Sequence, residues 1–149
     1  MNTLAKVFVY LVASFLFALL NSDLAAANQK ACTTAQEKQA LDEADRLPDW
    51  DAVHRSFIRF AHCDDGAIAE GYSDTVGRLL ERDWNHVAAL AKIVAADKRF
   101  ENFVLRHIDE TLPTDTLDSI ASNAEKSCPK DHSAFCRKIL QSARFASAH

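Results

Sequence analysis

The chain contains 149 residues, of which 48% are hydrophobic and 26% charged, and its formal net charge is −4 at pH 7. This mild acidity excludes a typical nucleic-acid-binding protein, because binding to phosphates depends on clustered lysine and arginine. Glycine and proline are scarce, at three each, and no alternating strand pattern is present, so the chain favours helices over sheets.

The N-terminal segment has the layout of a secretory signal. Lys6 precedes an apolar run over 7–20, and a stretch of small residues ends at Ala27, which is the order of segments that signal peptidase recognises. The run is shorter than the roughly 20 residues that a membrane-spanning helix needs. We therefore expect a signal peptide over 1–27, cleaved after its last residue or one residue earlier. A single domain over 28–149 would then be periplasmic or secreted and free of the membrane.

The four cysteines all follow this segment, at Cys32, Cys63, Cys128 and Cys136. An even number of cysteines in an exported chain indicates two disulfides. We expect the pairs Cys32–Cys63 and Cys128–Cys136, because each closes a neighbouring helical segment, while two other pairings stay open. Zinc binding is not expected, since the chain has no C-x-x-C and no short Cys/His spacing of the finger type. No metal or cofactor is predicted.

Apolar residues recur with helical spacing through the rest of the chain. The ranges expected to be helical are about 33–47, 50–61, 66–82, 84–96, 97–110, 115–126 and 133–145. The helix over 66–82 is the clearest, with one continuous apolar stripe from Ile68 to Leu80, and in the first helix Leu41 and Ala44 are expected to face inward. The predicted fold class is all-α, with about six to seven short antiparallel helices.

A short pattern of the form D-W-(D/N)-x-V occurs twice, at 49–53 and 83–87. The offset of 34 residues is the length of one helix–turn–helix unit in tetratricopeptide-like and HEAT-like stacks. Two similar helix starts also arise by chance. An irregular bundle and a short HEAT/TPR-like helical stack are therefore equally consistent with the sequence.

Acidic residues are concentrated around the helix over 66–82. Asp64 or Asp65 is expected to cap this helix and to interact favourably with its dipole. Glu70 and Asp74 lie one turn apart on its solvent side, and Glu81 lies on the same side near the end of the helix. These residues, with the turn that precedes the helix, form a candidate contact surface for a partner.

The same carboxylates have an alternative, chemical interpretation. Asp64, Asp65 and Glu70 would form a hydrolase or metal site together with His62, although a calcium site needs its oxygens spaced along a loop. The chain contains no H-E-x-x-H and no G-x-S-x-G, and His107 falls on the inner face of its helix as a core histidine. We therefore predict no catalytic residues.

The two tryptophans are further candidates for partner contact. Trp50 and Trp84 each begin a helix beside aspartates, and an aromatic ring surrounded by acidic groups is a common anchor for a protein partner. Burial in the core is the other expectation for both rings.

The segments CDDGAIAEGYSDTVGRLL (63–80) and FVLRHID (103–109), with the paired Cys128 and Cys136, resemble a group of small exported bacterial proteins of uncharacterised activity. More loosely, the design is similar to that of periplasmic immunity proteins. Those proteins are small, often helical and disulfide-bonded, and they neutralise a toxin by occupying its active-site cleft. The resemblance implies a protein partner such as a toxin or a hydrolase, and it assigns no functional residue.

The expected function is that of an exported, non-enzymatic protein-binding domain of the inhibitor or immunity type. Its partner-binding residues would be the acidic residues above together with both tryptophans. Two alternatives stay open: the hydrolase or metal-binding protein already described, and an envelope accessory protein without a single tight ligand.

Overall fold

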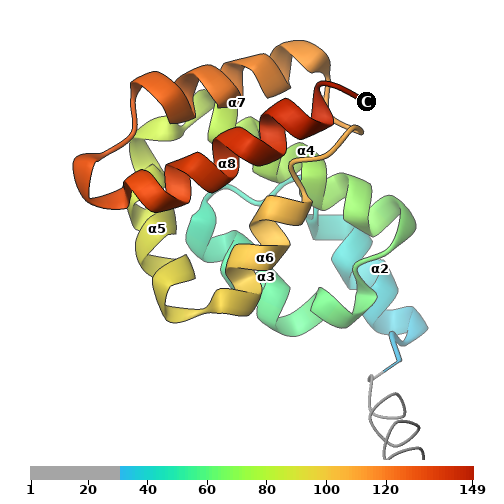
Figure 1. Ribbon diagram of the computed structural model, residues 1–149. Helices are drawn as coiled ribbons and strands as arrows, with labels where there is room; N and C mark the ends of the chain where they lie inside the picture. Colours follow the sequence, from blue (N-terminus) through green and yellow to red (C-terminus); the bar gives the residue numbers. More distant parts are fainter. Residues whose placement is uncertain (1–30) are drawn as a thin grey trace, which may run out of the picture. The chain divides into compact units, whose positions relative to one another are not determined.

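The computed structural model describes residues 31–149, which contain seven α-helices, three short 3-10 turns and no strand (Figure 1). In chain order the elements are α2 (Thr34–Glu43), α3 (Trp50–Phe60), η1 (Ala61–Cys63), α4 (Gly66–Arg82), η2 (Trp84–His86), α5 (Val87–Ala96), α6 (Lys98–Arg106), α7 (Thr114–Lys126), η3 (Lys130–His132) and α8 (Ser133–Ala146). The all-α class is confirmed. The signal peptide predicted over 1–27 lies outside the described residues. Within the described part, no helix combines the length and apolar character that a membrane crossing requires.

Short polar side chains begin several of the helices. The Thr33 hydroxyl accepts a hydrogen bond from the Gln36 N–H, and the Gln36 side chain accepts one from the Thr33 N–H. This reciprocal pair is a capping box. Asp49 caps α3 by accepting from the Ala52 N–H at 2.8 Å, and Asp97 caps α6. These oxygens satisfy N–H groups that no helical carbonyl reaches, so the helix starts follow from nearby residues.

The helix α2 ends at Glu43, four residues before its predicted end. Two side chains of α4 bind the carbonyl groups that follow it. The Thr75 hydroxyl donates to the Ala44 carbonyl at 2.7 Å, and the Arg78 guanidinium donates to the Leu47 carbonyl at 2.6 Å. These bonds hold the segment after α2 against α4.

Both predicted disulfides are present. Cys32–Cys63 joins the residue before the α2 cap to the end of η1, over a sequence separation of 31. Cys128–Cys136 joins the segment before η3 to the first turn of α8, over a separation of 8. The pairing predicted from neighbouring helical segments is confirmed, and two closed disulfides are consistent with an oxidising compartment.

The helices form an irregular bundle. α7 and α8 make the most extensive helix pair and run side by side (Figure 1). The principal neighbours of α4 are α7 and α2, whereas those of α3 are α2 and α5. A HEAT/TPR-like stack would require three successive hairpins, α3–α4, α5–α6 and α7–α8. The second and third pairs are in principal contact, but α3 and α4, which would form the first unit of the repeat, are not. The 34-residue offset therefore does not mark a structural repeat.

An aromatic cluster joins α3, α4 and α6 in the core. Tyr72 and Phe100 are fully buried. The ring of Phe103 lies with its centroid 5.0 Å from that of Phe57 and 5.0 Å from that of Tyr72, the second contact being edge-to-face. Contacts of this geometry stabilise a core beyond the area that they bury.

Gly71 lies where the end of α2 meets α4. A Cβ atom on this residue would be 3.0 Å from the Ala44 Cβ and 3.3 Å from the Asp45 backbone nitrogen. The Thr75 hydrogen bond holds that backbone in place, so it cannot move aside freely. We expect Gly71→Ala to lower the free energy of unfolding by about 1–2 kcal/mol, because the overpacking exceeds the gain in helix propensity. Urea unfolding measures the change. A stabilised variant would show that α2 tolerates a larger separation.

Candidate functional site

The two tryptophans lie in the core and not on a contact surface. Trp50 is 2% exposed and Trp84 is 9% exposed. The Trp84 indole N–H also donates to the Ser127 carbonyl at 2.9 Å, which ties the start of η2 to the end of α7. The prediction that these rings contact a partner is corrected, since packing between helices takes up both of them.

Asp64 is also withdrawn from the surface. Its side chain is 2% exposed, accepts a hydrogen bond from the Arg106 guanidinium, and lies 3.2 Å from Nε2 of His107. Burial alone would raise the pKa of this carboxyl, but the His107 hydrogen bond and the charges of His107 and Arg106 lower it below the usual 3.8. Asp64 therefore joins the turn before α4 to the end of α6 and does not contribute to a contact surface.

The remaining acidic candidates divide into one cap and three residues of α4. Asp65 accepts from the Gly66 N–H at 2.8 Å and begins the helix. Glu70 and Asp74 are exposed, and neither forms an ion pair within residues 31–149. Glu81 is partly buried and pairs with the adjacent Arg82 at 3.1 Å. We call Glu70, Asp74 and Glu81 the acidic face.

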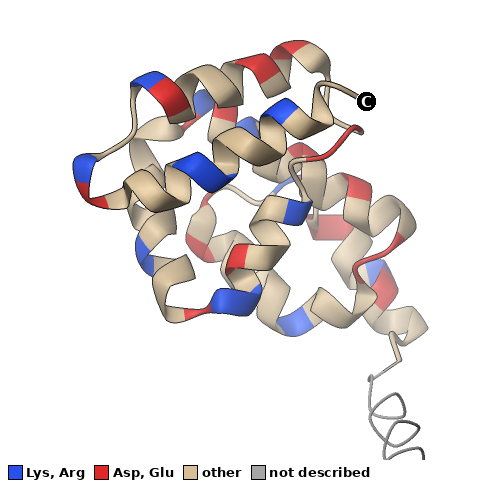
Figure 2. Ribbon diagram, in the orientation of Figure 1, with Lys and Arg blue, Asp and Glu red and all other residues tan. Residues whose placement is uncertain are grey.

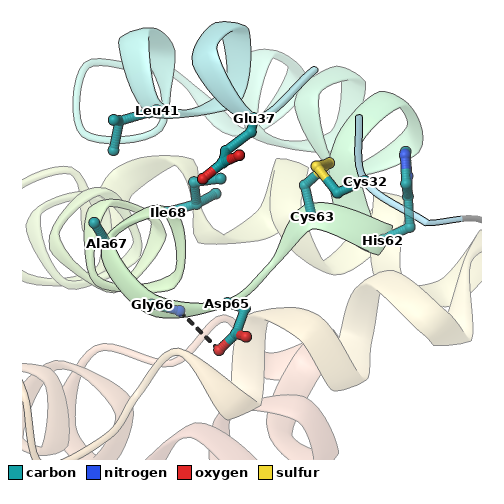
Figure 3. Close-up of a pocket in the computed structure, with 9 residues that line it drawn as sticks. All are labelled: Cys32, Glu37, Leu41, His62, Cys63, Asp65, Gly66, Ala67 and Ile68. Atoms are coloured by element: carbon teal, nitrogen blue, oxygen red, sulfur yellow. Dashed lines mark hydrogen bonds between the residues drawn. A yellow bond between two sulfur atoms is a disulfide. The ribbon is translucent and has the colours of Figure 1, made fainter. Parts of the chain in front are cut away.

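The carboxylates proposed for hydrolase or metal chemistry do not converge. Asp64 faces the end of α6, whereas Asp65 turns to its own helix start. His62 Nε2 lies 3.3 Å from the Gln36 side-chain oxygen, and Figure 3 shows His62 and Asp65 pointing in opposite directions. Within residues 31–149, no group of three or more His, Cys, Asp and Glu side chains could hold a metal ion. This geometry does not support the alternative.

A Ser–His–Asp chain that the sequence did not reveal lies inside the fold. The Ser73 hydroxyl is 3.0 Å from His107 Nδ1 and donates to Asp109 at 2.9 Å, while Nε2 of the same imidazole faces Asp64. These are the residue types of a hydrolase triad, in which the serine donates to Nε2 of the histidine and the aspartate accepts from Nδ1. Here the two ring nitrogens are exchanged, and the Ser73 hydroxyl donates to Asp109 and not to the imidazole. Ser73 is also 1% exposed and His107 2% exposed, and neither lines a cavity described below. This group of hydrogen bonds therefore joins α4 to the end of α6 inside the core, and the prediction that His107 is a core histidine is confirmed.

A surface cavity of about 400 Å³ lies between α2 and the first turn of α4. The Cys32–Cys63 disulfide forms one side, with Leu41 of α2 and Ile68 of α4 among the apolar residues that line it (Figure 3). Leu41 was expected to face inward, and the structure leaves it 49% exposed at this cavity. The α2–α4 cavity is therefore an open, partly apolar site next to the acidic part of the chain.

Negative charge is concentrated in the N-terminal part of the described chain, which forms this cavity. Residues 32–83 contain twelve acidic and six basic residues, a net charge of −6, whereas residues 84–149 contain eight acidic and nine basic residues, a net charge of +1. In Figure 2, α4 carries acidic segments while the charged residues of α8 are basic. The negative electrostatic potential is therefore strongest over the half of the domain that carries α2 and α4.

A second cavity, of about 210 Å³, lies among α5, α6 and α8. Its buried carboxylate, Glu101, accepts hydrogen bonds from Lys98 at 2.7 Å and from Lys138. Burial alone would raise the pKa of Glu101, but the hydrogen bonds from Lys138 and Lys98 lower it below its usual value. Both lysines are thus held by a partner within the fold, so this cavity is a weaker candidate than the α2–α4 cavity.

Comparison of the chain with models of protein families, with curated proteins and with solved structures found no match.

Proposed function

We propose that this chain is an exported, non-enzymatic binding protein of the inhibitor or immunity type, whose acidic face binds a basic protein partner. The observation that carries the proposal is the exposure of Glu70 and Asp74 on α4 without an ion-pair partner in residues 31–149. Acidic groups that no neighbouring cation neutralises attract positive charge most strongly, and complementary charge of this kind increases the rate of association.

The helix that carries these carboxylates is held firmly in place. Its inner stripe, from Ile68 to Leu80, is buried in the core, and the Cys32–Cys63 disulfide fixes the segment before its first turn. A surface held in its bound shape loses little entropy on association. An inhibitor that covers a basic substrate groove benefits from both properties, because it must bind quickly and must not deform.

Reversal of the charges on the acidic face tests this proposal. The chain with its disulfides closed would be immobilised and incubated with a periplasmic extract in low salt, and the retained proteins identified by mass spectrometry. We expect the wild-type chain to retain a basic protein, and Glu70→Lys/Asp74→Lys to bind that protein about ten-fold more weakly or worse.

The matched control is Glu110→Lys/Asp118→Lys, which changes the net charge equally at two exposed positions outside residues 32–83. This variant should retain the protein almost as well as the wild type. The proposal is contradicted if both double variants bind the protein equally well. It is also contradicted if the wild-type chain retains no protein and its expression does not protect cells from a toxin. A cellular phenotype without any stable partner would favour the envelope accessory alternative.

A further inference from the structure

The α2–α4 cavity has a lining that selects for one kind of side chain. We propose that it receives a long basic side chain, lysine or arginine, projecting from the protein partner. This inference rests on the proposed function, because it states which group of the basic partner enters the domain. The cavity volume of about 400 Å³ lies within the usual range for ligand pockets, about 300–1,000 Å³.

The walls of the cavity are mainly apolar. Leu41, Ala67 and Ile68 line it together with the Cys32–Cys63 disulfide. Gly66 has a backbone φ of +49°, and nothing lies within 4 Å of the position that a Cβ would take there, so no side chain covers this part of the lining. An alkyl chain would therefore meet carbon and sulfur over most of its length.

One carboxylate in this apolar lining has no hydrogen-bond partner within residues 31–149. Figure 3 shows the Glu37 carboxylate pointing from α2 toward Ile68, with no hydrogen bond to any other lining residue. The Asp65 carboxylate is already bonded to the Gly66 N–H. The His62 imidazole faces Gln36. Of the three ionisable lining residues, Glu37 is thus the one whose carboxylate is unpaired within the described part of the chain.

Lysine and arginine match this combination because they place a charged head at the end of an apolar stem. The stem would pack on Leu41 and Ile68 while the head pairs with Glu37. An acidic side chain would be repelled by the same carboxylate. A purely apolar side chain would cover the Glu37 carboxylate without replacing its hydrogen bonds to water, which costs free energy.

Short blocked peptides test the chemistry of the cavity directly. We would titrate the disulfide-closed chain with pentapeptides of Gly and Ser that carry arginine, lysine, norleucine or glutamate at the centre, and follow backbone amide signals by NMR. We expect the arginine and lysine peptides to shift the signals of Glu37, Leu41 and Ile68 in a saturable way. The norleucine and glutamate peptides should leave these signals unchanged.

Two variants separate the head contact from the stem contact. Glu37→Gln should weaken binding of both basic peptides by about two- to five-fold, the range of an exposed ion pair. The matched control Glu70→Gln, which removes the same charge outside the lining, should weaken it by less than about 1.5-fold. Leu41→Ala should also weaken binding. The Leu41 side chain is 49% exposed, so we expect this variant to fold, and its amide spectrum checks that it does.

The result of the peptide titration is separate from the result of the capture experiment. If no basic peptide shifts the cavity signals, or if Glu37→Gln and Glu70→Gln weaken binding equally, the inference about the cavity is overturned. The proposed function still holds in that case if the acidic face retains a basic protein. The opposite combination is also distinguishable. Charge reversal of the acidic face that leaves capture unchanged contradicts the proposed function. Peptide binding that depends on Glu37 would still support the inference about the cavity.

Discussion

Removal of the Cys32–Cys63 disulfide is expected to lower the free energy of unfolding by about 3–4 kcal/mol, and removal of Cys128–Cys136 by about 2–3 kcal/mol. The difference comes from the unfolded chain, because a cross-link over 31 residues restricts it more than one over 8 residues. The double variants Cys32→Ala/Cys63→Ala and Cys128→Ala/Cys136→Ala, compared by chemical denaturation, measure both values.

The two cysteine pairs are well matched for this comparison. In each pair one cysteine is buried, Cys63 at 3% and Cys136 at 2% exposure, and its partner is half-buried. The packing lost on substitution by alanine is therefore similar in both. An equal cost for the two pairs, or a larger cost for the shorter loop, would contradict the chain-entropy explanation. Loss of Cys32–Cys63 should also weaken binding of a basic peptide, because this disulfide forms one side of the α2–α4 cavity.

Replacement of Asp64 by alanine is the second change with a large expected effect, about 3 kcal/mol of lost unfolding free energy. The substitution removes the acceptor for the Arg106 guanidinium and for His107. His107 is 2% exposed, so water cannot replace the lost hydrogen bond. Hydrogen bonds to charged groups contribute about 1.5–3 kcal/mol each, and an unsatisfied buried partner adds to the cost of losing them. Urea denaturation at pH 7 measures the effect.

The contribution of Asp64 should depend on pH in a defined direction. Its pKa in the fold lies below the usual 3.8, so the unfolded chain binds a proton at this carboxyl more readily than the folded chain does. The stabilisation is therefore fully present above about pH 4 and is lost as the pH falls through the lowered pKa. The difference in stability between the wild type and Asp64→Ala should shrink below about pH 4.

Asp74→Ala provides the control for this measurement, since Asp74 is exposed on α4 and forms no ion pair within residues 31–149. It should change the unfolding free energy by less than about 0.5 kcal/mol at pH 7. A constant difference between the wild type and Asp64→Ala from pH 7 to pH 3 would show that the ionised carboxylate does not stabilise the fold.

The elements of the fold were largely predictable because their signals are local. Thr33, Asp49 and Asp97 each cap a helix by binding N–H groups two or three residues ahead, so a short stretch of sequence contains both partners. The apolar stripe of α4 is likewise a property of one segment, and its bounds agree with the prediction at both ends. The end of α2 was missed because the side chains that bind the carbonyl groups after it lie far along the chain. Thr75 donates to the Ala44 carbonyl and Arg78 to the Leu47 carbonyl, each over 31 residues.

The candidate site was less predictable, because burial reversed the roles of several residues. Asp64 belongs to an acidic stretch in sequence, yet its partners Arg106 and His107 lie 42 and 43 residues further along. Trp84 similarly finds the Ser127 carbonyl 43 residues away. Leu41 had the spacing of a core residue, but α4 approaches α2 closely at Gly71 and leaves Leu41 at the edge of an open cavity.

The sequence by itself determined the all-α class and the helix starts, which depend on residues that are close along the chain. It also gave the preferred disulfide pairs, which followed from the even number of cysteines and from the helical segments that each pair encloses. Only the tertiary structure decided between a bundle and a repeat stack, and only it separated buried acids from exposed ones. The physical reason is that the ionisation, burial and availability of a side chain depend on neighbours in space. For Glu37, Glu70 and Asp74 those neighbours leave carboxylates open to a partner, and for Asp64 they do not.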